Sequence, residues 1–526
     1  MIQEDSIIKR YCLSVFGLDI RSLALFRILA ALLLLVDLAM RASTLIAMYS
    51  DDGVLPRPML TSLLQAMDDT GLSQWGSGSW SIHSLSGAPE FQITLFVIAW
   101  FFAVLMLAGC FTRVATFVSW FLLLSLQNRN CLVLTSGDTI FMLVMMWSIF
   151  LPLNRVWSVD AWRRSKGRLS DSRAHNSDQI VSFASAGFII QLAIMYFCSG
   201  LAKWNEIWFG GQALNYVFQL DIYTTPFAES LLKYTELNRL VGIATVLAEF
   251  FLPWLLLIPW KNAWWRILNL IVFCGMHISI LLTLSIGLFG YICIAIWMAL
   301  LPGGIWNWLL GKNHQSSSEH HSPPSAKSVH IHGWSAIGHG TSEIICAAML
   351  LFVLAWNVAN YFPSAFFEEK TISLAGRDIT RHVQRDHWAT KTFQYLGQAT
   401  GLSQQFVMFG VPPSENAWFV FRAQLVDGST QDVFLGGRLI PEYGAMSGPE
   451  FMPNFHWRKY LRNLTFPVYI PFRQRVAGFM AEQWNESHSE QQQIVFLELE
   501  CYLDIIGPNP VPGELRGMLS WGTYPR

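Results

Sequence analysis

The stretch that decides the fold class runs from Ile267 to Leu301 and reads ILNLIVFCGMHISILLTLSIGLFGYICIAIWMALL. It holds no Asp, Glu, Lys or Arg. One straight helix of this length would reach about 52 Å, whereas the apolar core of a bilayer is about 30 Å thick. The break at Ser285-Ile286-Gly287 and Gly290 therefore predicts two short transmembrane helices, over 267–282 and 284–301.

The whole chain has the same apolar character. Of its 526 residues, 53% are hydrophobic and only 13% are charged, which is about half the charged share of a soluble domain. An aromatic content of 14% excludes a disordered chain, and a net charge of −1 gives no reason to expect nucleic acid as a partner. This composition predicts a polytopic membrane protein.

Seven further apolar runs are candidates for transmembrane helices, since a span needs about 20 apolar residues. They cover residues 22–40, 91–110, 114–127, 138–153, 181–201, 240–259 and 344–362. The predicted fold is therefore an all-α polytopic membrane bundle of about nine transmembrane helices. An odd number of spans would put the two ends of the chain on opposite sides of the membrane.

Charge in the connecting segments predicts the orientation. The segment 154–180 carries six basic residues, namely Arg155, Arg163, Arg164, Lys166, Arg168 and Arg173, whereas the segment 41–90 carries only Arg41 and Arg57. Cytoplasmic loops are enriched in Lys and Arg. We therefore expect the N-terminus on the cytoplasmic side and the C-terminal region on the other side.

Composition divides the chain into four parts. Residues 1–302 form the predicted transmembrane domain, and 303–342 read as a flexible cytoplasmic linker rich in His, Ser and Pro. The linker histidines have no spacing typical of a closed metal site, so no metal is predicted. Residues 343–362 are the last predicted transmembrane helix, and 363–526 form a small α/β domain. In that domain the sequence predicts a hairpin around Asp427-Gly428, helix over 455–485 and a strand over 494–504.

Ionisable residues inside membrane segments are costly and are often functional. Here they are Arg27, Asp37, Asp138, Lys203, Glu249 and His277. Arg27 and Asp37 are too far apart on one helix to pair, so each needs a partner on another helix. A structural ion pair of Arg27 with Glu249 or Asp138 is the alternative to a functional role.

Lys203 allows two interpretations. It follows Tyr196-Phe197-Cys198-Ser199-Gly200-Leu201-Ala202 and precedes Trp204 and Trp208. A lysine beside tryptophans at a helix end can simply extend its amine to the membrane surface. Alternatively, burial disfavours the ammonium and leaves a neutral amine that can act as a base.

Five motifs in the same order resemble those of one family. They are Leu25-Phe26-Arg27 with Asp51-Asp52-Gly53-Val54-Leu55-Pro56-Arg57; Trp157-Ser158-Val159-Asp160; Ser199-Gly200-Leu201-Ala202-Lys203-Trp204 with Trp208, Gly211 and Tyr216; His277; and Ser285-Ile286-Gly287-Leu288-Phe289-Gly290-Tyr291. The chain resembles bacterial HTTM (horizontally transferred transmembrane) domain proteins, which share the membrane region of vitamin K-dependent gamma-carboxylase. The resemblance covers about residues 15–302.

The resemblance implies a bacterial inner-membrane protein with a periplasmic or extracellular C-terminal domain. It implies that Lys203 is a catalytic base on a reduced, vitamin K-like quinone, that His277 lines the quinone site, and that Glu249 matches an acidic position. Gly137-Asp138 stands where the carboxylase has an Asn-His pair. Because of this departure, the resemblance does not extend to the coupled carboxylation of a glutamate, which is a lyase reaction. Asp138, Arg27, Trp208 and Tyr196 complete the candidate lipid-binding residues.

Two hypotheses follow, and a transporter is disfavoured because no inverted repeat is visible. One is a carboxylase-like enzyme acting on a quinol or related lipid. The other is a non-catalytic scaffold or maturation factor that binds a lipid or a secreted peptide. The enzyme hypothesis predicts that Lys203, His277, Glu249 and Asp138 border one mostly apolar, quinone-sized cavity.

Overall fold

A computed structural model describes residues 2–68, 74–167, 178–311, 337–361, 367–374, 377–384, 388–434, 436–437, 452, 454–507 and 514–525. Within these residues the helices of the membrane domain are α1 Ile2–Phe16, α2 Ile20–Ala42, α3 Leu45–Tyr49, α4 Arg57–Asp68, α5 Pro89–Ala108, α6 Thr112–Arg129, α7 Ser136–Ser148, α8 Val159–Gly167, α9 Phe183–Ala202, α10 Glu206–Phe209, α11 Ala213–Val217, α12 Pro226–Leu231, α13 Thr235–Leu255, α14 Asn262–Thr283, α15 Phe289–Met298, α16 Gly303–Leu309 and α17 Ile337–Tyr361.

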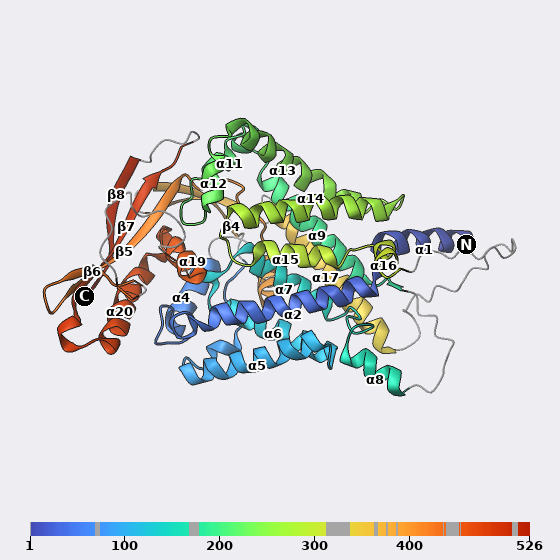
Figure 1. The fold of residues 1–526 in the computed structure, drawn as a ribbon, viewed down its shortest axis with the longest axis horizontal. Helices are drawn as coiled ribbons and strands as arrows, with labels where there is room; N and C mark the ends of the chain where they lie inside the picture. Colours follow the sequence, from blue (N-terminus) through green and yellow to red (C-terminus); the bar gives the residue numbers. More distant parts are fainter. Residues whose placement is uncertain are drawn as a thin grey trace.

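Each of the nine apolar runs expected from the sequence contains a helix, namely α2, α5, α6, α7, α9, α13, α14, α15 and α17. These helices run roughly side by side in one bundle (Figure 1). The short helices α1, α8 and α16 lie at one end of it, and the C-terminal domain lies at the other. Hydrogen bonds agree with this arrangement, because Arg21 at the start of α2 bonds to Asn307, whereas Ser43 after α2 bonds to Asn454.

Length and composition do not confirm nine membrane crossings. Among the described residues six helices are long and apolar enough to span a membrane, namely α2, α5, α9, α13, α14 and α17. The bent pair α15 and α16 would make seven. The remaining helices fall short, because α7 has only 13 residues, or about 20 Å, and α6 ends in the polar residues Gln127, Asn128 and Arg129. Several apolar helices nevertheless make this an integral membrane protein.

The short helix α7 occupies the centre of the bundle, which explains why it can be short. Its residues from Thr139 to Ser148 are all buried, and it contacts α6, α9 and α15. Gly187 on α9 lets the ring of Trp147 pack against the helix backbone, since a Cβ at Gly187 would lie 2.5 Å from that ring. A helix that is apolar all round and covered by protein on every side need not match the thickness of a bilayer.

The C-terminal domain combines a sheet with helices, as the sequence predicts. It contains β3 Phe367–Leu374, β4 Arg377–Gln384, α18 Trp388–Thr400, β5 Glu415–Leu425, β6 Thr430–Asp432, α19 Phe455–Asn463, α20 Ile470–Ser487, β7 Ile494–Ile505 and β8 Glu514–Tyr524. The antiparallel order is β6-β5-β7-β8, with a separate β3–β4 hairpin. The expected hairpin, the helix over 455–485 and the strand over 494–504 are confirmed, except that the helical stretch is divided between α19 and α20.

The expected linker over 303–342 is only partly described. Its first residues form α16, and α17 begins at Ile337, six residues before the predicted start at residue 343. Residues 312–336, with most of the linker histidines, lie outside the described residues.

Candidate functional site

Lys203 lies at the C-terminal end of α9 with its amine inside the protein. Only 4% of the residue is exposed, which excludes an amine that reaches the membrane surface. Its Nζ donates to Glu249 Oε2 on α13 at 2.8 Å and to Ser199 Oγ, one turn back on α9, at 2.5 Å. The structure thus joins Lys203 and Glu249 in a buried ion pair.

Close packing of α9 on α13 makes this pair possible. Gly200 faces α13, and a Cβ there would lie 2.8 Å from Phe250 N and 3.1 Å from Glu249 Cβ. A larger residue at 200 would push the two helices apart and lengthen the Lys203–Glu249 contact. Glycine at position 200 therefore permits the close approach of α9 and α13 on which the ion pair depends.

Trp208 and the segment before β5 cover the amine from the C-terminal side. Lys203 Nζ lies 5.6 Å from the centre of the Trp208 ring. The Trp208 indole donates to Phe409 O at 2.8 Å, and Asn205 Nδ2 donates to Gly410 O at 2.8 Å. The segment Phe406–Gly410, here called the strap, is thereby held across the end of α9.

Tyr196 and His277 form a second buried unit beside the pair. Tyr196 OH lies 2.6 Å from His277 Nε2 and accepts a hydrogen bond from Trp297 Nε1 at 2.8 Å. Because Tyr196 already accepts from Trp297, its own proton can go to His277 Nε2, which places the proton of a neutral imidazole on Nδ1. Among the described residues, Nδ1 has no hydrogen-bond partner although it is buried.

A small cavity connects these groups. Its volume is about 30 Å³, and its lining residues are Ser136, Met195, Tyr196, Ser199, Glu249, Met276, His277, Ile280, Phe289, Phe406 and Met408. Lys203 reaches this wall through Ser199 and Glu249. The polar groups and apolar walls suit a hydroxyl-bearing apolar ligand. As formed by the described residues, however, this cavity is much smaller than the quinone-sized cavity expected from the sequence.

Asp138 does not belong to this site, contrary to the expectation. It caps α7 through Thr135, and it accepts from Arg41 Nη2 at 2.5 Å. Arg41 also donates to Asp37 at 2.8 Å and to Tyr49 OH at 2.8 Å. The partner of Asp37 is therefore on its own helix, four residues on, and not on another helix as expected.

Arg27 is also outside the site. Its guanidinium donates to Trp157 O at 2.6 Å and to Leu153 O at 3.3 Å, at the end of the bundle opposite Lys203. The expected ion pair of Arg27 with Glu249 or Asp138 is wrong, because Lys203 and Arg41 take those carboxylates. Arg27 ties α2 to the segment after α7.

Residues that were not assigned from the sequence also contribute. Ser199 was recognisable, since a residue four positions before Lys203 on a helix shares its face. Trp297, Phe406 and Met408 lie far from Lys203 in the sequence, and only the tertiary fold brings them to the site.

Comparison with known protein families identifies a domain in this chain. The family model described as HTTM domain matches residues 80–303. No curated protein and no solved structure matches the chain. The matched segment includes Tyr196, Lys203, Glu249 and His277. This chain therefore contains an HTTM domain, and the buried Lys203–Glu249 pair lies inside it.

Proposed function

We propose that this protein is an integral membrane enzyme of the carboxylase-like family that removes a proton from a hydroxyl group of a lipid-soluble molecule. A reduced quinone is the candidate substrate. The observation that carries the proposal is the buried Lys203–Glu249 pair, because Glu249 and His277 line the same small cavity. Among the described residues, His277 Nδ1 has no hydrogen-bond partner.

The pair can act as a base only after an internal proton shift. As an ammonium, Lys203 has no free electron pair. Transfer of one proton from Nζ to Glu249 across 2.8 Å leaves a neutral amine and a carboxylic acid. In a site without water the two charges lose their hydration. The free-energy difference between the ionised pair and the neutral pair therefore becomes smaller. The neutral amine then takes the hydroxyl proton, as the O–H bond breaks and an N–H bond forms.

His277 has a complementary role in this proposal. A neutral imidazole with its proton on Nδ1 offers a hydrogen-bond donor to the oxygen that gains negative charge. Such preorganised donors stabilise developing charge strongly in a site without water. Tyr196 and Trp297 hold the ring in that tautomer.

A ligand with a ring would require the site to open. Phe406 and Met408 of the strap line the cavity, whereas the rest of the lining comes from α7, α9, α13, α14 and the start of α15. The strap is attached through the two backbone carbonyls that Trp208 and Asn205 bind. Displacement of the strap is the movement that would enlarge the cavity with the least disturbance of the bundle.

We propose nine crossings, with the N-terminus in the cytoplasm and the C-terminal domain outside the bacterial inner membrane. Successive helices of the bundle run in alternating directions (Figure 1), which supports this topology. Helix α8, which carries Arg163, Arg164 and Lys166, lies at the same end of the bundle as the N-terminus of the chain (Figure 1). Reporter fusions after residue 167 and at residue 526 should report opposite sides. The same side for both would contradict nine crossings.

One observation favours the alternative of a non-catalytic scaffold. A second pocket, of about 530 Å³, lies at the C-terminal-domain end and has a mixed lining, in which Ser285, Asn454 and Arg458 are among the polar residues. It is large enough to receive a side chain of a secreted peptide, whereas the cavity beside Lys203 is closed. A scaffold of this kind would not need Lys203 to lose a proton.

The test uses the full chain in nanodiscs with reduced phylloquinone as the probe. Oxygen uptake that depends on this probe reports proton removal, because a reduced quinone reacts with oxygen faster once its hydroxyl is deprotonated. Lys203→Met should reduce the uptake at least about a hundredfold. The matched control is Lys261→Met, which removes an exposed lysine beside Trp260. No probe-dependent uptake by the wild type, or equal uptake in both variants, would favour the scaffold.

A further inference from the structure

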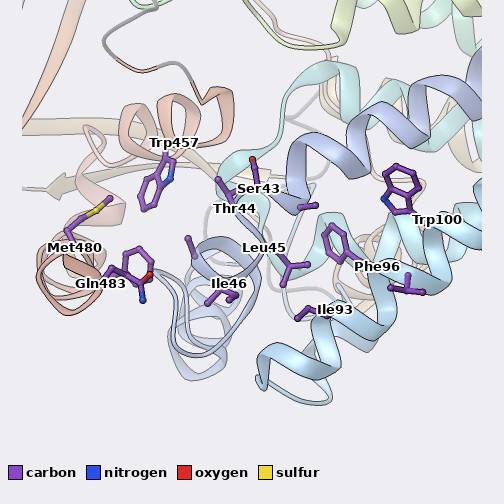
Figure 2. A pocket seen from close by; sticks show the side chains of 14 residues that line it. Ser43, Thr44, Leu45, Ile46, Ile93, Phe96, Trp100, Trp457, Met480 and Gln483 are labelled. Carbon is purple, nitrogen blue, oxygen red and sulfur yellow. The ribbon is translucent and has the colours of Figure 1, made fainter. Parts of the chain in front are cut away.

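A large pocket lies away from Lys203, between the membrane bundle and the C-terminal domain. It has a volume of about 890 Å³ and is here called the seam groove. Residues 42–47 form its floor, α5 forms one wall, and α19 and α20 form the other (Figure 2). Neither Lys203 nor any residue that lines the cavity beside it lines the seam groove.

The lining of the seam groove is mostly apolar, and its described residues carry no charge. Ile93, Phe96 and Trp100 project from α5, and Trp457 and Met480 approach from the C-terminal domain (Figure 2). None of the described lining residues is Asp, Glu, Lys, Arg or His. Such a surface offers an anionic or cationic head group no partner, but it suits a hydrocarbon chain.

The groove is continuous with an exposed apolar surface of α5. Helix α5 is one of the six helices able to span a membrane. Its Val97, which lines the groove, is 62% exposed, and Phe101 and Val104 extend the same exposed apolar surface along the helix at 57% and 48%. A chain in the surrounding bilayer can therefore enter sideways, without crossing water.

The described lining contains three polar side chains, namely Ser43 and Thr44 on the floor and Gln483 on α20. Ser43 Oγ accepts from Asn454 Nδ2 at 3.3 Å, and Gln483 on α20 donates to Glu486 at 3.4 Å. Both lie where the bundle meets the C-terminal domain. An uncharged or zwitterionic head group could remain beside these polar groups while its chain lies between α5 and α20.

We infer that the seam groove binds one hydrocarbon chain of a zwitterionic membrane lipid, and that this chain fills the space between the bundle and the C-terminal domain. The volume is within the range of about 300–1,000 Å³ that is typical of small-molecule sites. The bound chain covers Val97 and the partly exposed Met480, which water would otherwise reach. The lipid thus helps to attach the C-terminal domain to the membrane domain.

Photolabelling of the full chain tests this inference. The protein is placed in nanodiscs of phosphatidylcholine that contain phosphatidylcholine with a diazirine in one acyl chain. Irradiation should label residues of α20 as well as residues of α5. Lipids that merely surround the bundle would not reach α20, so labelling confined to the outward face of α5 would overturn the inference.

Two substitutions of the same residue type on one helix sharpen the test. Val97→Trp should fill the groove and lower α20 labelling at least about fivefold, because an overfilled site excludes a chain. Val104→Trp is the matched control, since Val104 is seven residues away on the same face and outside the groove. Met480→Trp, which fills the groove from the other wall, should act like Val97→Trp. Equal labelling of all four proteins would overturn the inference.

Discussion

Two buried ionic clusters lie at the same end of the bundle and differ in what they can do. In one, Arg41 donates to Asp37, Tyr49 and Asp138. In the other, Lys203 donates to Glu249 and Ser199, beside His277, whose Nδ1 has no partner in the described part of the chain. An arginine cannot lose its proton in a protein, whereas a lysine can. The Arg41 cluster is therefore suited to hold helices together, whereas the Lys203 cluster is suited to transfer a proton.

The Arg41 cluster should be the more important for stability. Arg41→Met would leave Asp37 and Asp138 buried without their cation, and breaking a buried pair costs about 3–5 kcal/mol even when only one carboxylate remains. We expect Arg41→Met to lower the thermal stability more than any substitution in the Lys203 cluster. Arg41→Lys, which keeps the charge but loses part of the hydrogen-bonding fork, should lose less. An unchanged unfolding midpoint in Arg41→Met would contradict the structural role of the cluster.

The Lys203 cluster should tolerate removal of both charges. Lys203→Met alone leaves Glu249 buried and unpaired, which should cost roughly 3 kcal/mol of unfolding free energy. The double variant Lys203→Met/Glu249→Gln should recover most of this loss, while the oxygen uptake with reduced phylloquinone remains absent. Thermal unfolding of the two variants in the same nanodiscs measures the difference. Recovery of activity together with stability would show that the pair is only structural.

Helix spacing offers a smaller perturbation of the same site. Gly200→Val would place methyl groups against the backbone at Phe250 and should cost about 1–3 kcal/mol. The pair would lengthen, so oxygen uptake should fall as well. Gly275→Val on α14 is the matched control, because a Cβ at Gly275 meets no atom within 4 Å. A Gly200→Val protein as active as Gly275→Val would mean that the spacing of α9 and α13 is not required.

Asp221 lies outside the membrane helices and differs from Asp138 in its neighbours. Asp138 pairs with Arg41, whereas Asp221 lies near two other acidic residues. Burial, with smaller contributions from Glu229 and Asp504, raises the pKa of Asp221 to about 6 from its usual 3.8. The folded protein therefore binds this proton more tightly than the unfolded chain, so the stability contribution of Asp221 is greatest below pH 3.8 and is lost as the pH rises to about 6.

The variant Asp221→Asn should remove that loss. At pH 7 it should be more stable than the wild type by about 1–2 kcal/mol, after allowance for partial exposure to solvent. At acid pH the two proteins should converge. Thermal unfolding of both proteins across this pH range measures the difference, and a constant difference would contradict the raised pKa. This is the smallest of the expected effects.

The positions of the helices could be predicted from the sequence, because long apolar runs need no tertiary information. The number of crossings could not, since α7 is short for a span and is enclosed by other helices. Lys203, Glu249 and His277 were recognisable as ionisable residues in apolar segments. Their pairing was not, because Glu249 could equally have paired with an arginine of α2, and only the fold shows that Lys203 takes Glu249 while Arg41 takes Asp138.

The strap illustrates a further limit of prediction from the sequence. Phe406 and Met408 line the cavity but lie about 200 residues after Lys203 in the sequence. The strap is held in place through the backbone carbonyls of Phe409 and Gly410, which accept from Trp208. Backbone carbonyl acceptors leave no mark in the side-chain pattern. The closed state of the site was therefore not predictable from the sequence.

The most direct test of the central claim replaces Lys203 by a residue that keeps the positive charge but cannot release its proton. Lys203→Arg retains a cation for Glu249 but cannot supply a neutral base. We predict a folded protein whose oxygen uptake with reduced phylloquinone is at least about a hundredfold below that of the wild type, whereas Lys261→Arg should keep the wild-type rate. Wild-type uptake by Lys203→Arg would show that the position needs only positive charge, and it would contradict the proposal that Lys203 acts as a base.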